Sequence, residues 1–158
     1  MSTFSLISSQ IKDVNFGERV TVVEPCNLYG CALCDDVFVG PFVEIQSGVV
    51  IGARTKVQSH SFVCSLVTVG EDCFLGHGVM FVNDTFSKGG PAGGDKSKWK
   101  ATSIGSDVYI GSNATILPVK VCDEVIIGAG AVVTKDIFTP GVYAGNPAVL
   151  IKEKGKNG

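Results

Sequence analysis

Residues 39–81 read VGPFVEIQSGVVIGARTKVQSHSFVCSLVTVGEDCFLGHGVMF, and they repeat a pattern of six residues without interruption. A period of six is neither the 3.6-residue period of an α-helix nor the plain alternation of a long strand. It predicts short strands that are separated by tight corners. The apolar residue that returns at every sixth position is Val39, Ile45, Ile51, Val57, Val63, Val69, Leu75 and Phe81 in turn.

The same period continues on both sides of this stretch. If the apolar residue is position 1, position 2 is Gly in eight repeats and position 5 is small or β-branched in most. Positions 1 and 5 point inward, and glycine at position 2 relieves crowding where the backbone turns. Three repeats close one triangular coil, so eighteen repeats predict an all-β parallel β-helix of about six coils. The other position-1 residues are Phe16, Val22, Leu28, Leu33, Ile104, Ile110, Ile116, Val121, Ile127 and Val133.

The composition is that of one folded domain over residues 1–158. The 20 glycines argue against a helical bundle, and a charged fraction of only 18% argues against a disordered chain. A net charge of −2 argues against a general nucleic-acid binder. The chain has no apolar run of transmembrane length, and its N-terminus does not resemble a signal peptide. We therefore expect a single cytoplasmic domain.

The six cysteines point to packing rather than to chemistry. Cys31 and Cys34 form a lone CxxC, with no second CxxC and no nearby histidine to complete a zinc site. Cys26 and Cys73 fall on the inward-facing position 5. We expect reduced thiols that behave as small core residues, and we expect no metal site.

The repeat is interrupted after Phe81. Residues 82–100 have no register of six, and they contain four glycines, four lysines and the only tryptophan of the chain. We interpret 84–101 as a loop that is inserted into the β-helix. Long loops within compact repeats are often functional, although a solvated insertion that the fold simply tolerates is the alternative.

Both histidines of the chain precede this loop. His60 and His77 belong to repeats that begin 18 residues apart, which stacks them on neighbouring coils near one edge of the prism. Asn83 and Asp84 follow at the next corner of the coil that holds His77. We expect the four side chains to converge at the root of the loop. The alternative for each histidine is a purely structural hydrogen-bonding role.

The pattern of six resembles that of the hexapeptide-repeat proteins, whose fold is a left-handed parallel β-helix, and the resemblance covers nearly the whole chain. The carbonic-anhydrase-like branch of that family uses three histidine ligands, and this chain has two histidines in total. The sugar nucleotidyltransferase branch carries a nucleotide-binding domain before the prism, for which this chain leaves no residues. The acyltransferase branch needs only the prism.

Three motifs resemble the nucleotide-sugar N-acetyltransferases. Residues 110–118 (IGSNATILP) and 128–136 (GAGAVVTKD, followed by GNPA at 145–148) are common to many hexapeptide acyltransferases. Residues 76–84 (GHGVMFVND) are more specific and resemble enzymes that acetylate the 3-amino group of dTDP- or UDP-linked amino sugars. The resemblance implies acetyl-CoA as donor, a homotrimer with active sites between subunits, and a sugar for a bacterial cell-surface glycan such as lipopolysaccharide.

The chain departs from these relatives in two places. Relatives often carry Pro-Arg shortly after the Asn-Asp pair, where this chain has Ser87 and Lys88. Arginine binds a phosphate or carboxylate through a bidentate pair of hydrogen bonds, whereas lysine offers a single point charge. Lys88 is therefore a candidate substrate contact, and the identity of the sugar stays undetermined. Residues 152–158 are too short for the C-terminal helices of some relatives, and we expect a frayed tail.

The expected reaction needs a neutral amine, so a base must remove a proton from the ammonium group. Histidine suits this task at neutral pH, which makes His77 the first candidate and His60 the second. Asn83 would orient the amino group or the sugar. Asp84 would hold a histidine tautomer or bind a sugar hydroxyl. Alternatively, the departing CoA thiolate takes the proton itself.

Residues for the acetyl-CoA site follow from their motif positions in the family. Backbone N–H groups near Ser112 and Ala129 would bind the thioester oxygen and the pantetheine arm. Lys135 and Lys152 are candidates for the CoA phosphates, with a solvated surface role as the alternative. The adenine end would be shaped by Asn146 and Pro147. Competing functions are an O-acetyltransferase, an enzyme with a larger acyl donor, and a non-catalytic trimeric scaffold.

Overall fold

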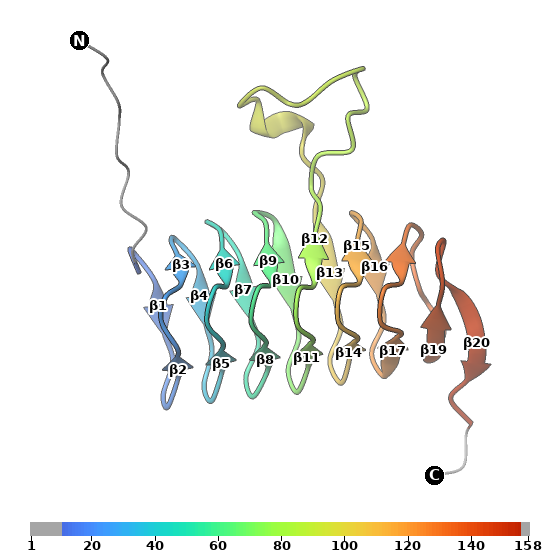
Figure 1. The fold of residues 1–158 in the computed structure, drawn as a ribbon, viewed down its shortest axis with the longest axis horizontal. Helices are drawn as coiled ribbons and strands as arrows, with labels where there is room; N and C mark the ends of the chain where they lie inside the picture. Colours follow the sequence, from blue (N-terminus) through green and yellow to red (C-terminus); the bar gives the residue numbers. More distant parts are fainter. Residues whose placement is uncertain (1–10, 156–158) are drawn as a thin grey trace.

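A computed structural model describes residues 11–155. The chain winds around one long axis as a β-solenoid, and a single loop projects from its side (Figure 1). Within the described residues, twenty strands form three sheets, which are the three sides of a prism. The architecture is consistent with the left-handed parallel β-helix that the resemblance implies.

Each coil contributes one short strand to each sheet. The first sheet contains β1 (Asn15–Phe16), β4 (Ala32–Leu33), β7 (Val50–Ile51), β10 (Val67–Val69), β13 (Thr102–Ile104) and β16 (Lys120–Val121). The second contains β2 (Thr21–Val22), β5 (Phe38–Val39), β8 (Lys56–Val57), β11 (Phe74–Leu75), β14 (Tyr109–Ile110), β17 (Val125–Ile127), β19 (Gly141–Ala144) and β20 (Val149–Glu153). The third contains β3 (Asn27–Leu28), β6 (Glu44–Ile45), β9 (Phe62–Val63), β12 (Met80–Phe81), β15 (Thr115–Ile116) and β18 (Val132–Val133).

The period of six predicted the pairing of the strands. Val57 pairs with Val39 on one side and with Leu75 on the other, a spacing of three repeats in each direction. The parallel register resumes across the loop, where Leu75 pairs with Ile110. The position-1 residues from Leu28 to Val133 are buried in one continuous core. Six complete coils form, and Ile137 and β19 add part of a seventh that the repeat pattern did not indicate.

Glycine at position 2 is required by the distance between coils. The Cα of Gly52 lies directly against the backbone of Gly70, and Gly70 lies in the same way against Gly105. A Cβ at Gly52 would overlap the main chain of Gly70, which has no flexible side chain to move aside. The main chains of successive coils can therefore come into contact at position 2 only because the residue at that position is glycine.

The two ends of the solenoid depart from the sequence prediction. Phe16 was expected inside but is 49% exposed, because among the described residues no coil lies beneath the first one. Lys152 and Glu153 were expected in a tail, but they belong to β20, which runs antiparallel to β19 and pairs Lys152 with Val142. Residues 156–158 of the expected tail lie outside the described residues.

The cysteines are free thiols. Cys31, Cys64 and Cys73 are buried, as the packing prediction requires, whereas Cys26, Cys34 and Cys122 are only partly buried. Burial raises the pKa of the Cys64 thiol to about 11. Among residues 11–155, no group of three or more His, Cys, Asp or Glu side chains is placed to hold a metal ion. The one helix of that range is η1 (Lys96–Lys98), so the described chain has no helix able to cross a membrane.

Candidate active site

The candidate residues lie in the columns of turns that form the edges of the prism. We call the turns from the second sheet to the third the histidine corner; they include 40–42, 58–60, 76–78, 111–113 and 128–130. We call the turns from the third sheet to the first the loop corner; they include 64–66, 82–101, 117–119 and 134–136.

His77 stands at the middle of the histidine corner with an exposed side chain. Its ring Nδ1 lies 2.8 Å from Oγ of Ser59, which occupies the same turn position one coil earlier. The main chain of the turn is held from both sides, because Gly78 N donates to Ser59 O at 3.0 Å and Asn113 N donates to His77 O at 2.8 Å. The imidazole is therefore fixed through one ring nitrogen, which leaves Nε2 as the atom that can act on a substrate.

His60 occupies the neighbouring coil of the same corner, as the spacing of the repeats predicted. Its ring stacks on Phe42, with 4.9 Å between the ring centroids and 30° between the planes. The two histidines thus share an edge, but their contacts differ. His60 packs on an aromatic ring, whereas His77 is hydrogen-bonded through its ring.

Asn83 and Asp84 close the root of the loop. Asn83 Nδ2 donates to Ser65 O at 3.1 Å, and Asn83 O accepts from Lys100 N at 2.9 Å, so one residue ties both ends of the loop to the solenoid. Asp84 accepts hydrogen bonds from Phe86 N at 3.0 Å and from Ala92 N at 2.7 Å. Both side chains therefore shape the loop.

The expected convergence of these four side chains is wrong within one chain. Residues 79–82 form one side of the prism between His77 and Asn83, and an extended backbone of that length spans about 13 Å. The partner of the His77 ring is Ser59, and the Asp84 carboxylate is bound to the backbone of the loop. Asp84 therefore does not hold a histidine tautomer in its own chain.

The loop carries more positive than negative charge on its surface. Asp95 accepts from Ser97 N and Ser97 Oγ at the start of η1, and its Oδ2 lies 3.9 Å from Lys98 Nζ. With Asp84 also occupied, the carboxylates of the loop are bound to groups of the loop itself. The exposed Lys88, Lys96 and Lys100 have no ion pair among residues 11–155, so the loop can meet an anionic ligand.

Four of the residues expected at the acetyl-CoA site continue the histidine corner beyond His77. They are Ser112, Ala129, Asn146 and Pro147, on the three coil levels that follow His77. Three coil steps of about 4.8 Å make this row roughly 14 Å long. Within the described part of the chain, the N–H groups of Ser112 and Ala129 have no backbone acceptor. The corner thus offers a line of donors beside the imidazole.

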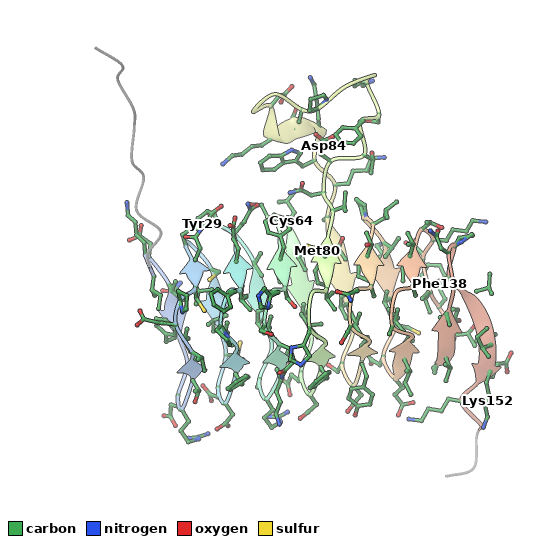
Figure 2. The ribbon with its side chains drawn as sticks, viewed as in Figure 1. Tyr29, Cys64, Met80, Asp84, Phe138 and Lys152 are labelled. Atoms are coloured by element: carbon green, nitrogen blue, oxygen red, sulfur yellow. The ribbon has the colours of Figure 1, made fainter. Side chains whose placement is uncertain are left out.

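The two lysines expected at the CoA phosphates lie elsewhere. Lys135 belongs to the loop corner. Lys152 borders a groove of about 370 Å³ on the outer face of the second sheet, together with the apolar side chains of Tyr109, Ile126 and Val142. Figure 2 shows Asp84 in the projecting loop and Lys152 at the far C-terminal end of the solenoid. Within one chain, Lys135 and Lys152 therefore lie neither beside each other nor beside the loop that carries Asp84.

Ser59 is not among the site residues predicted from the sequence. The spacing of the repeats does indicate it, because Ser59 lies 18 residues before His77 and therefore at the same position of the preceding coil. In a parallel β-helix such residues stack directly on each other. A search for polar residues three repeats away from each histidine would have found this contact.

Comparison with known proteins supports the repeat and the fold. Residues 101–135 match the family model of the hexapeptide repeat of succinyl-transferase. The bifunctional protein GlmU of Streptococcus uberis is 31% identical over 150 residues, an alignment that covers 94% of this chain and 30% of that protein. The chain thus spans about a third of the length of the curated relatives that it matches.

Two solved structures share the architecture. One is a hexapeptide-repeat-containing acetyltransferase of Vibrio cholerae complexed with acetyl coenzyme A, with a TM-score of 0.68, 19% identity and coverage of 80% of this chain and 72% of that one. The other is a point mutant of AntD, an N-acyltransferase of Bacillus cereus, in complex with dTDP and coenzyme A; its TM-score is 0.56, with 17% identity and coverage of 90% and 84%. At these identities the likeness concerns the fold. Residues 101–135 thus carry a recognised hexapeptide repeat, and the fold of the chain is the one found in these two acyltransferases.

Proposed function

We propose that this chain is an acetyl-CoA-dependent N-acetyltransferase that acylates the amino group of a nucleotide-linked amino sugar. The observation that carries the proposal is the histidine corner. It combines an exposed imidazole, held through one ring nitrogen, with a row of turns whose N–H groups at Ser112 and Ala129 have no backbone acceptor among residues 11–155. This pairing of a base with hydrogen-bond donors suits acyl transfer from a thioester to an amine.

The donor is proposed to lie along the histidine corner. An extended pantetheine arm would run past the turns at Ser112 and Ala129, and the thioester would reach the level of His77. Asn146 and Pro147 would meet the adenine end, as expected from their motif. The solved Vibrio cholerae relative was crystallised with acetyl coenzyme A, which supports this donor for the shared fold.

The acceptor is proposed to be anionic. Lys88 and the neighbouring lysines of the loop suit the diphosphate of a nucleotide sugar, because their charges are not consumed by carboxylates of the loop. AntD, which shares the fold, was crystallised with dTDP and coenzyme A, and this supports a nucleotide-linked substrate. His77 would take the proton from the amino group as the nitrogen attacks the thioester carbon and the CoA thiolate leaves.

The separation of His77 from the loop supports a homotrimer. In one chain the loop root and the imidazole lie at different corners, and the loop projects away from the solenoid (Figure 1). A complete site would form when the loop of one subunit extends toward the histidine corner of its neighbour. This is the arrangement that the family resemblance implies.

Calorimetric titration of acetyl-CoA into the purified protein tests the donor. We expect saturable binding with one site per chain. Product formation is then followed by mass spectrometry with dTDP- and UDP-linked amino sugars and with the matching hydroxy sugars. An N-acetylated product supports the proposal, an O-acetylated product replaces it with O-acetyl transfer, and absence of acetyl-CoA binding at millimolar concentration overturns it.

A further inference from the structure

The contact between Ser59 and His77 has a chemical consequence. Ser59 Oγ and His77 Nδ1 lie 2.8 Å apart, and both residues occupy the third position of their repeats on adjacent coils. The main-chain hydrogen bonds from Gly78 N to Ser59 O and from Asn113 N to His77 O hold the turns in register. The contact is therefore imposed by the coil stacking, and the hydroxyl is already in place before any ligand binds.

A neutral imidazole has one N–H and one lone pair, and its single partner decides which nitrogen carries the proton. Ser59 can either donate to Nδ1 or accept from it, since a hydroxyl does both. No other hydrogen bond to the His77 ring is made by residues 11–155. The orientation of one hydroxyl thus selects the tautomer of the exposed imidazole.

We propose that Ser59 is a positioning residue that accepts a hydrogen bond from His77 Nδ1–H and so keeps the lone pair of Nε2 free for the substrate amine. This inference deepens the proposed function and rests on it. In the reaction the neutral amino nitrogen of the sugar would attack the thioester carbon, its proton would bind to His77 Nε2, and the CoA thiolate would leave. Nδ1 keeps its own proton throughout, so the bond to Ser59 persists in the neutral and in the protonated ring.

The chemistry of a hydroxyl suits this role. A carboxylate at the same place would also accept from Nδ1–H, but its charge would favour the protonated imidazole and would hold the proton after transfer. A neutral oxygen orients the ring without that penalty. Ser59 therefore fixes the tautomer while leaving His77 able to release the proton.

The same contact distinguishes the two histidines. His60 packs face to face on Phe42, and no hydroxyl or carboxylate of the described chain bonds to its ring nitrogens. Its tautomer is not selected by any of these groups. The base is therefore assigned to His77, and His60 is a packing residue.

Nitrogen-15 NMR of the imidazole groups in the protein as purified tests the tautomer directly. The chain has only two histidines, so the spectrum contains two rings, and His60→Asn assigns them. We expect His77 at slightly alkaline pH to be protonated at Nδ1 with a lone pair at Nε2. In Ser59→Ala we expect a mixture of both tautomers, whereas Ser103→Ala, which changes an exposed side chain of the first sheet, leaves the spectrum unchanged.

Kinetics supply the second readout. Loss of one neutral hydrogen bond predicts an approximately two- to tenfold fall in kcat for Ser59→Ala, with KM values for both substrates within about twofold of wild type. Ser59→Thr keeps the hydroxyl and is expected to restore kcat. A wild-type His77 protonated at Nε2, or Ser59→Ala with unchanged tautomer and kcat, overturns the proposal. If the wild type acetylates no amino sugar, the proposed function fails separately, and the spectrum still decides whether Ser59 selects the tautomer.

Discussion

The imidazole of His77 is the side chain on which the proposed reaction most directly depends. Asparagine at this position keeps a polar group of similar size but cannot take up a proton. We therefore predict that His77→Asn lowers kcat about a hundredfold or more at saturating acetyl-CoA. Steady-state kinetics with the best amino-sugar acceptor measure this effect.

His60→Asn is the matched control, because His60 occupies the same corner one coil earlier but packs on Phe42. We expect this variant to lose less than about tenfold in kcat. If His77→Asn also loses less than tenfold, the side chain is not the base. The departing CoA thiolate then becomes the proton acceptor.

At the scale of the strand and turn, stability depends on the close contact between coils at position 2. A methyl group at Gly52 would overlap the main chain of Gly70. Overpacking of this kind costs about 1–3 kcal/mol. We predict that Gly52→Ala lowers the melting temperature by several degrees in thermal unfolding followed by circular dichroism.

Gly90→Ala is the control for this element. Gly90 lies in the projecting loop, where a methyl group on its Cα would meet no atom of the described chain within 4 Å and its backbone is not left-handed. The melting temperature of this variant should stay close to that of wild type. Equal melting temperatures for the two variants would show that the coils can move apart at low cost.

The strands were predictable from sequence because each repeat of six fixes which residue faces the core and which residue lies 18 positions away on the next coil. The same spacing correctly placed His60 and His77 on one edge of the prism. The predictions for the two ends of the solenoid were wrong, because Phe16 has no described coil beneath it and Lys152 belongs to an antiparallel strand outside the repeat. The spacing also failed for Asn83 and Asp84, because their side chains bind backbone groups that the hexapeptide pattern does not place.

At the scale of the whole molecule, ion pairs connect successive coils along the edge between the first and second sheets. Arg19 bonds to Asp36 at 2.7 and 2.8 Å, and Arg54 bonds to both oxygens of Asp72 at 2.7 Å. These guanidinium groups hold the pKa of the Asp36 and Asp72 carboxyls below its usual value through hydrogen bonds. The ladder therefore contributes stability that depends on pH.

The sign of that dependence follows from the lowered carboxyl pKa in the folded state. Stabilisation by the Arg54–Asp72 pair is complete above the unfolded-state pKa of about 3.9, and it is lost as the pH falls through the folded-state pKa. We predict that Arg54→Gln melts below wild type at pH 6, and that the difference shrinks toward pH 2.5. Lys56→Gln, which alters an exposed strand residue without an ion pair among residues 11–155, should show no such trend. A constant difference between pH 6 and 2.5 for Arg54→Gln would contradict the role of the two carboxylates that pair with Arg54, those of Asp72 and Glu71.

In the proposed trimer, we expect neighbouring subunits to complete each site. Asn83 O accepts from Lys100 N at 2.9 Å, so the ends of the loop are close enough for residues 84–99 to be replaced by a two-residue Asn-Gly turn. We expect this variant to keep its fold and to lose nearly all of its activity, as we expect for His77→Asn. If the imidazole of one subunit works with the loop of its neighbour, mixed trimers of the two variants contain some intact sites.

Random mixing in equal amounts would place an intact histidine corner beside an intact loop at about a quarter of the sites in cyclic trimers. We therefore predict that co-refolding the two variants restores about a quarter of wild-type activity, and that mixing them without refolding restores little. Wild type refolded with the loop variant serves as the reference for refolding yield. Zero recovery with intact trimers, measured by light scattering, would mean that each site takes its imidazole and its loop from the same chain.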